Sequence, residues 1–288
     1  MAGFSSVKKL VDAEESGKVI FSSWRKSPSQ VTTIGIWFDL SMSPGNPTPQ
    51  YYASAPLTSA SMSYMDTGGL YHGDGGNIAD STQYLRELSI MTLTATALPM
   101  PMILCDYLMY YPFVDEGASD EQPMTNTCSL PRFTSGCGVQ IMPVSVAGRT
   151  GGQSFKVRYT NSDDVPDRIS QIVTENSVSV IGSIATSDRA TANSMSPFIP
   201  LQAGDKGVKS IQGVTMLGND VGLFTLVLVK PLAQLSLRGI DAPVEIDYFL
   251  DFSQVPKFEN NSYLNFLCNP AGSLAATALH GTIGTIWA

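Results

Sequence analysis

Apolar and polar residues alternate along most of this chain, in short segments that glycine and proline interrupt every few residues. In Ser154–Thr160, for example, Phe155, Val157 and Tyr159 fall on one face, and two basic residues fall on the other. A period of two predicts a half-buried antiparallel strand.

Similar short segments, rich in β-branched and aromatic residues, recur along the sequence and are expected to be strands. They are Val31–Phe38, Leu85–Thr96, Met102–Tyr111, Gly138–Val146, Ser177–Ile184, Val208–Leu217, Leu223–Val229, Leu232–Leu237, Val244–Phe252 and Tyr263–Leu267. Strands at a spacing of about 8–12 residues, without long helices between them, predict an all-β fold, an antiparallel β-sandwich or a jelly-roll-like arrangement.

Helix is expected mainly near the N-terminus, over Ser5–Glu15. Val7, Leu10 and Val11 recur there at helical spacing, and Gly17 follows as a stop signal. The expected organisation is therefore an N-terminal arm or helix at 1–30, a β-sandwich domain at 31–288 and a C-terminal tail at 274–288. A second division near 148–152 is an open alternative to a hairpin connection. The proline- and glycine-rich stretch 44–76 predicts a long functional loop or an inter-subunit arm.

Both terminal segments carry large apolar side chains although neither is long enough to form a core. We expect these side chains to contact neighbouring subunits, because left in water they would favour aggregation. The candidate assembly contacts are Val7, Leu10, Val11, Phe21, Trp24, Ile283, Ile286 and Trp287. The alternative is that either segment folds back on its own domain.

The composition also favours assembly. Charged residues make up 15% of the chain, below the roughly 25% of an average soluble domain. Polarity comes instead from 33 Ser and 22 Thr, and the hydrophobic fraction of 43% argues against disorder. A surface rich in hydroxyl groups is easier to desolvate against a partner than a charged one.

Charge and hydropathy limit the partners. The net charge is −8, and Lys8-Lys9 and Arg25-Lys26 are the basic groupings, so direct binding of nucleic acid is not expected. The most apolar run, Val221–Leu237, is interrupted by Lys230-Pro231 and falls short of a membrane span. The start of the chain does not read as a signal peptide, and synthesis in the cytosol is expected.

The residues that could support catalysis or metal binding are scattered. Cys105, Cys128, Cys137 and Cys268 form no CxxC pair and are expected to be free thiols, with a Cys128–Cys137 bridge as the alternative under oxidation. His72 lies in a glycine-rich loop that predicts exposure to solvent, and His280 lies near the C-terminal end. We therefore expect no enzyme activity, no metal and no cofactor.

Two acidic groupings and one aromatic cluster have simpler interpretations than a binding site. Asp74, Asn77 and Asp80 have calcium-like spacing but lack the bidentate glutamate of an EF-hand loop. Asn161-Ser162-Asp163-Asp164 is typical of a hairpin turn. The aromatic residues Tyr107, Tyr110, Tyr111 and Phe113 are expected to pack in the core.

Three segments of the sequence resemble β-rich virion proteins of tailed bacteriophages. They are the glycine turn and strand of Gly148–Ser170, the run Leu228-Val229-Lys230-Pro231-Leu232, and the segment that ends Asn269-Pro-Ala-Gly-Ser-Leu-Ala-Ala276. The resemblance extends over Met100–Ala276 and concerns the general character of the sequence. It includes no defined motif, so it transfers no functional residues.

The resemblance implies a structural protein on the capsid exterior, most simply a capsid decoration or cement protein. Its implied partners are further copies of the chain, as a trimer, and the major capsid protein of the same particle. The alternatives are a carbohydrate-binding or adhesive β-sandwich, and a hydrolase whose site the sequence does not mark. An exposed aromatic row with adjacent amides would favour the former, and two facing carboxylates in a deep cleft would favour the latter.

Overall fold

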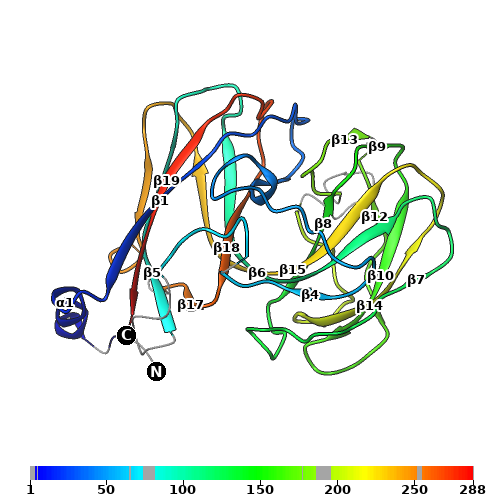
Figure 1. The fold of residues 1–288 in the computed structure, drawn as a ribbon, viewed down its shortest axis with the longest axis horizontal. Helices are drawn as coiled ribbons and strands as arrows, with labels where there is room; N and C mark the ends of the chain where they lie inside the picture. Colours follow the sequence, from blue (N-terminus) through cyan, green and yellow to red (C-terminus); the bar gives the residue numbers. More distant parts are fainter. Residues whose placement is uncertain are drawn as a thin grey trace.

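The computed structural model describes residues 4, 6–64, 66–73, 82–176, 178–185, 196–251 and 255–287 (Figure 1). Strand accounts for 46% and helix for 5% of the structure, which confirms the predicted all-β fold with a short N-terminal helix. The helix α1 (Val7–Glu15) begins at the cap residue Ser6, whose side chain accepts a hydrogen bond from the backbone N–H of Lys9. A short 3-10 turn, η1, covers Leu40–Met42.

The strands form three main sheets, and the strand pairs among the described residues are antiparallel. The first sheet has the order β16 (Val244–Asp247), β5 (Thr82–Thr92), β19 (Leu279–Trp287), β1 (Val19–Lys26) and β3 (Gly45–Asn46), with β17 (Lys257–Glu259) also on β5. The central sheet has the order β2 (Phe38–Asp39), β18 (Tyr263–Cys268), β6 (Met100–Asp115), β15 (Leu223–Leu237) and β8 (Gln140–Ser145), with β4 (Ala60–Ser61) on β6.

The third sheet lies at the other end of the molecule. Its order is β11 (Arg168–Ile169), β10 (Ser154–Asn161), β14 (Val208–Met216) and β7 (Gln122–Pro123), with β12 (Val173–Thr174) on β10. A small ladder joins β9 (Arg149–Thr150) to β13 (Val178–Ser179). The stretch 148–152, left open between a domain boundary and a hairpin connection, therefore contains a short strand.

The two longest strands, β6 and β15, pair along their whole length and connect two lobes (Figure 1). Their halves nearest Met100 and Leu237 pack against the first sheet and form one hydrophobic core. Their other halves, including Tyr111 and Phe224, pack against the third sheet and form a second core. Alternate side chains such as Tyr107 and Val229 enter a third core.

Irregularities in β6 and β15 keep these cores filled. The register shifts between Leu228 and Val229, where Leu108 of β6 has no direct partner. Leu108 and Met109 consequently both enter the second core. Such a bulge changes which face successive residues occupy.

Several predicted strands differ from the observed ones. The expected strands 223–229 and 232–237 are one strand, β15, because Pro231 sits at a register shift, where a missing N–H is tolerated. The expected strand at 31–38 is strand only from Phe38, because Gly35 has φ 78° and a turn joins Thr33 to Ile36. Within 177–184 the described strand is β13 alone.

The terminal segments also differ from the expected arm and tail. β1 lies within the expected arm 1–30, yet it pairs with β19 over all eight of its residues. β19 lies between β5 and β1 and is an interior strand of the first sheet. Strand β1 therefore belongs to the sandwich because its hydrogen-bonding partner is the other end of the chain, whereas α1 packs on the surface of the first sheet.

The described part of the 44–76 stretch folds over the central sheet. Tyr52 and Met62 are buried in the third core, and Leu70 bridges to Leu264 of β18. No helix in the part of the chain that the structure describes is long and apolar enough to cross a membrane.

Candidate functional site

The eight predicted assembly residues divide into a buried and an exposed group. Trp24, Ile283, Ile286 and Trp287 are at most 5% exposed and lie in the cores of their own chain. They are inaccessible to a neighbouring subunit in this fold, which corrects the expectation for these four. Leu10 is partly buried against the cluster around Ala13.

The other three predicted residues remain on the surface. Val7 is 78% exposed, Val11 42% and Phe21 59%. Val7 and Val11 are one helical turn apart on α1, and Phe21 is on the neighbouring strand β1. We call these three residues the apolar N-terminal surface.

Trp287 is held in place by groups from three parts of the chain. Its indole N–H donates to the side-chain oxygen of Asn260 at 2.7 Å, and its backbone N–H donates to the carbonyl of Lys18. Gly73 packs so closely that a Cβ there would lie 2.5 Å from the ring. This packing explains why the C-terminal segment is part of the core.

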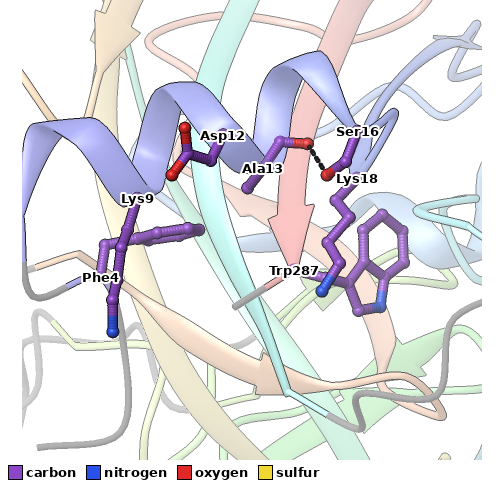
Figure 2. Close-up of a pocket in the computed structure, with 7 residues that line it drawn as sticks. All are labelled: Phe4, Lys9, Asp12, Ala13, Ser16, Lys18 and Trp287. Atoms are coloured by element: carbon purple, nitrogen blue, oxygen red, sulfur yellow. Dashed lines mark hydrogen bonds between the residues drawn. The ribbon is translucent and has the colours of Figure 1, made fainter.

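A pocket of about 280 Å³ lies between α1 and the end of β19 (Figure 2). Its lining residues are Phe4, Lys9, Asp12, Ala13, Ser16, Lys18 and Trp287. Figure 2 shows Phe4 and Lys9 at one end and Lys18 beside the Trp287 ring at the other. The Ser16 hydroxyl donates to the carbonyl of Ala13, so it is engaged in closing the helix end. The lining carries no paired nucleophile and base.

His72 is buried rather than facing solvent, which corrects the prediction from its glycine-rich surroundings. It is 1% exposed. One ring nitrogen lies 2.8 Å from the side-chain oxygen of Gln83, and the other lies 2.7 Å from the carbonyl of Ser262. Burial lowers the pKa of this histidine. Because both nitrogens are hydrogen-bonded within the protein, His72 connects loops and strands of the first lobe.

A buried carboxylate, Asp39, organises the start of the 44–76 stretch. It accepts hydrogen bonds from the hydroxyls of Tyr52, Tyr107 and Ser41. Burial raises the pKa of Asp39, and these hydrogen bonds oppose the rise. Lys26 lies nearby, donates to the carbonyls of the 41–47 segment, and has its pKa lowered to about 8 by burial.

Asp106 of β6 and Arg132 form a fully buried ion pair. Two guanidinium nitrogens donate to the two carboxylate oxygens at 2.9 and 2.7 Å. Arg132 also donates to the carbonyls of Met62 and Tyr107, and Asp106 accepts from the Ser262 hydroxyl. The pair therefore links β6 to three loops, and its hydrogen-bonding capacity is used within the protein.

A second buried cluster lies beside the β9–β13 ladder. Arg149 donates to both oxygens of Glu116 at 2.7 Å, and Glu175 lies 3.4 Å from the same guanidinium. Burial raises the pKa of Glu175 to about 8, while Arg149 opposes the rise. Both carboxyl oxygens of Glu175 and both amide atoms of the adjacent Asn176 lack a hydrogen-bond partner among the described residues.

A second pocket, of about 330 Å³, lies on the third-sheet lobe. Its lining residues are Asn126, Cys128, Ser129, Leu130, Thr134, Thr160, Asp164, Lys209 and Ser210. Lys209 forms an ion pair with Asp164 at 2.6 Å. The pocket is thus lined mainly by hydroxyl, amide and paired charged groups.

The remaining predicted groups have structural positions. The turn at Asn161 is confirmed, because its side-chain oxygen accepts from the N–H groups of Asp163 and Val165. Tyr107, Tyr110 and Tyr111 are buried as predicted, whereas Phe113 is only partly buried. The calcium-like residues Asp74, Asn77 and Asp80 lie outside the described residues. Among the residues that are described, no group of three or more His, Cys, Asp or Glu is placed to hold a metal ion.

The buried ionic clusters were not predicted from the sequence. A buried ion pair at Asp106 could have been predicted, because a lone acidic residue inside the apolar run 102–111 must be paired if that run is buried. Its partner Arg132 lies in a loop between prolines, glycines and hydroxyl residues, with no pattern that marks it. The four cysteines are not bridged; Cys105 and Cys268 are buried, and Cys137 is exposed.

No protein-family model matches the chain, and no curated protein matches it. The comparison with solved structures gives the structure of infectious bursal disease virus Gt strain, with 8% identity and a TM-score of 0.19, covering 93% of this chain and 80% of that chain. The structure of the Gx strain of the same virus gives 8% identity and a TM-score of 0.16, covering 94% of this chain and 81% of that chain. Likenesses of this size carry no argument about fold or function.

Proposed function

We propose that this chain is a virion structural protein, a capsid decoration or cement protein that stabilises a phage head from its exterior. It assembles with copies of itself and contacts the major capsid protein of the same particle. The resemblance noted in the sequence implies a trimer. Its contribution to the particle is binding energy between proteins, without catalysis and without direct contact to nucleic acid.

The observation that carries this proposal is the apolar N-terminal surface on a body that buried ion pairs and hydrogen bonds hold together. Val7 and Val11 on α1 and Phe21 on the following strand β1 are exposed, whereas Trp24, Ile286 and Trp287 are buried. Burying exposed apolar groups against a partner stabilises the complex by about 25 cal/mol per Å² of apolar area removed from water. A cement protein requires such a surface on a body that does not deform.

The outer face of the first sheet fits the same function. Ser23, Thr282 and Ser89 face one another across β1, β19 and β5 and are all at least partly exposed. A row of hydroxyl groups on a sheet is flat and carries no charge to desolvate. Such a face can lie against a capsid surface at low desolvation cost.

The test is the composition and stability of the particle. Purified virions should contain the chain in hundreds of copies, as measured by quantitative mass spectrometry. Particles that lack it should break at a lower temperature, and adding the purified chain should restore the original temperature. Phe21→Lys should weaken this rescue, whereas Val221→Lys, at a residue that is 72% exposed and lies beside β9 instead of α1, should not. Absence from virions, or a few copies per virion, contradicts the proposal.

A carbohydrate-binding module is the second candidate, and the hydroxyl-lined pocket of about 330 Å³ favours it. The pocket offers an amide, several hydroxyls and the Asp164–Lys209 pair as hydrogen-bonding groups for a neutral sugar. Saturation-transfer NMR with a panel of monosaccharides tests it. A signal that Ser210→Val abolishes would support this function, and no signal from any sugar would exclude it for these ligands.

A further inference from the structure

One long edge of the first sheet is largely uncovered. β19 pairs with the inner edge of β1 from Val19 to Lys26. Among the residues that the structure describes, only β3 pairs with the outer edge, and only at Arg25 and Lys26. An open strand edge pairs readily with a strand of another chain, because its backbone N–H and C=O groups have no partner.

The backbone hydrogen bonds define which residues face that open edge. On the β19 side, the carbonyl of Lys18 accepts from the N–H of Trp287 at 3.1 Å. Backbone groups of alternate residues in a strand point to opposite sides. Val19, Phe21 and Ser23 therefore present their N–H and C=O groups to the outer edge.

We propose that this edge pairs antiparallel with the same edge of a second copy of the chain, about a two-fold axis at Phe21. The inference rests on the proposed function, which requires self-assembly. A two-fold contact of this kind joins the copies in pairs, in place of the trimer that the resemblance implies. In this register Val19 faces Ser23 of the partner subunit, and Phe21 faces Phe21 of the partner subunit. All three edge residues then exchange hydrogen bonds, whereas a register shifted by two residues leaves one unpaired on each chain.

The side chain at the axis fits this pairing. Phe21 is 59% exposed and lies over Gly284, where an added Cβ would be 2.7 Å from its ring. Residues opposite each other at a hydrogen-bonded position have Cα atoms about 5.5 Å apart. Two phenylalanines at that position form a cross-strand aromatic pair, which covers rings that are otherwise in water.

The charges at the two ends of the edge favour antiparallel over parallel pairing with a second copy. Glu15 is exposed at one end of the edge and Arg25 at the other, and no ion pair among the described residues involves either. Antiparallel pairing brings each Arg25 toward Glu15 of the partner subunit, while parallel pairing places like charges together. Gly17 has φ 75° and lies between α1 and β1, so the extended edge begins only at Val19.

A disulfide experiment tests the register directly. All variants carry Cys137→Ser, because Cys137 is exposed. Under mild oxidation Phe21→Cys should form a covalent dimer, since the expected separation of about 5.5 Å lies within the disulfide range of about 4.4–6.8 Å. Ser23→Cys is the matched control and should remain largely uncrosslinked, because its counterpart is Val19. Equal cross-linking of the two variants would overturn the register.

Charge exchange tests the pairing without cysteine. Sedimentation velocity should show a dimer of the full chain that dissociates on dilution. Glu15→Arg and Arg25→Glu should each weaken dimerisation about five- to tenfold, and the double variant should restore it, because both symmetric contacts re-form with reversed signs.

The outcomes separate this inference from the proposed function. If the chain forms oligomers whose mass and stability ignore these substitutions, and Phe21→Cys does not cross-link, edge pairing is wrong while self-assembly stands. If the chain is monomeric at every concentration and absent from virions, both are wrong.

Discussion

Glu175 illustrates how a single buried side chain makes this protein sensitive to pH. It is fully buried, its neighbours Glu116 and Asp220 are also acidic, and burial raises its pKa to about 8 from an ordinary value of 4.5. The unfolded chain therefore releases this proton at lower pH than the folded chain does. The contribution of Glu175 to stability is complete below pH 4.5 and is lost as the pH rises toward 8.

Glu175→Gln should remove this pH dependence, because glutamine is neutral in both states. We expect the free energy of unfolding of the variant and of the original protein to be similar at pH 5. At pH 8.5 the variant should be the more stable by a few kcal/mol, at about 1.4 kcal/mol per unit of pKa change. Urea denaturation at the two pH values measures the difference, and a difference that does not change with pH would contradict the prediction.

Close packing of glycines against aromatic rings shapes the elements of the first sheet. In β19, Gly281 lies directly under Trp24 of β1, and a Cβ at Gly281 would lie 2.5 Å from the indole. Trp24 in turn packs against Phe266 of the central sheet, with ring centroids 5.1 Å apart. The absence of a side chain at one strand position thus sets the distance between two sheets.

Gly281→Ala should therefore destabilise the protein by about 1–3 kcal/mol, the usual cost of overpacking a core. Gly239→Ala is the control, because a Cβ at Gly239 meets nothing within 4 Å. Thermal unfolding followed by circular dichroism measures both variants. Equal melting temperatures for the two would show that the Trp24 ring can move without cost.

At the scale of the whole molecule, the two lobes share their longest strands. β6 and β15 supply residues to the first core, against the first sheet, and to the second core, against the third sheet. The buried Asp106–Arg132 pair lies on β6 between these halves. Unfolding of either lobe removes packing from strands that the other lobe needs.

Calorimetry should accordingly show one unfolding transition in which the calorimetric and van't Hoff enthalpies agree. Leu88→Ala in the first core and Phe155→Ala in the second core should each lower the temperature of this one transition. Each should reduce the free energy of unfolding by about 2–5 kcal/mol. Two separate transitions, each shifted by one substitution, would mean that the lobes unfold independently.

Part of this architecture is encoded locally and could be predicted. The alternation in Ser154–Thr160 predicts β10, and the helical spacing of Val7, Leu10 and Val11 predicts α1, since both patterns depend on neighbours in sequence. The low charge and the apolar ends predicted burial against other subunits, but Trp24, Ile283, Ile286 and Trp287 are buried within their own chain. Val7, Val11 and Phe21 remain candidates for contact with another subunit.

The rest was decided by pairing between distant parts of the chain. The apolar residues of β19 are consistent both with an exposed tail and with an interior strand, and only its ladders with β1 and β5 distinguish the two. The same holds for His72, which a glycine-rich sequence placed in solvent and which Gln83 and Ser262 hold in the interior. A hydrophobic pattern specifies which side chains must leave water, but the partner that covers them depends on contacts across more than two hundred residues, which local spacing does not encode.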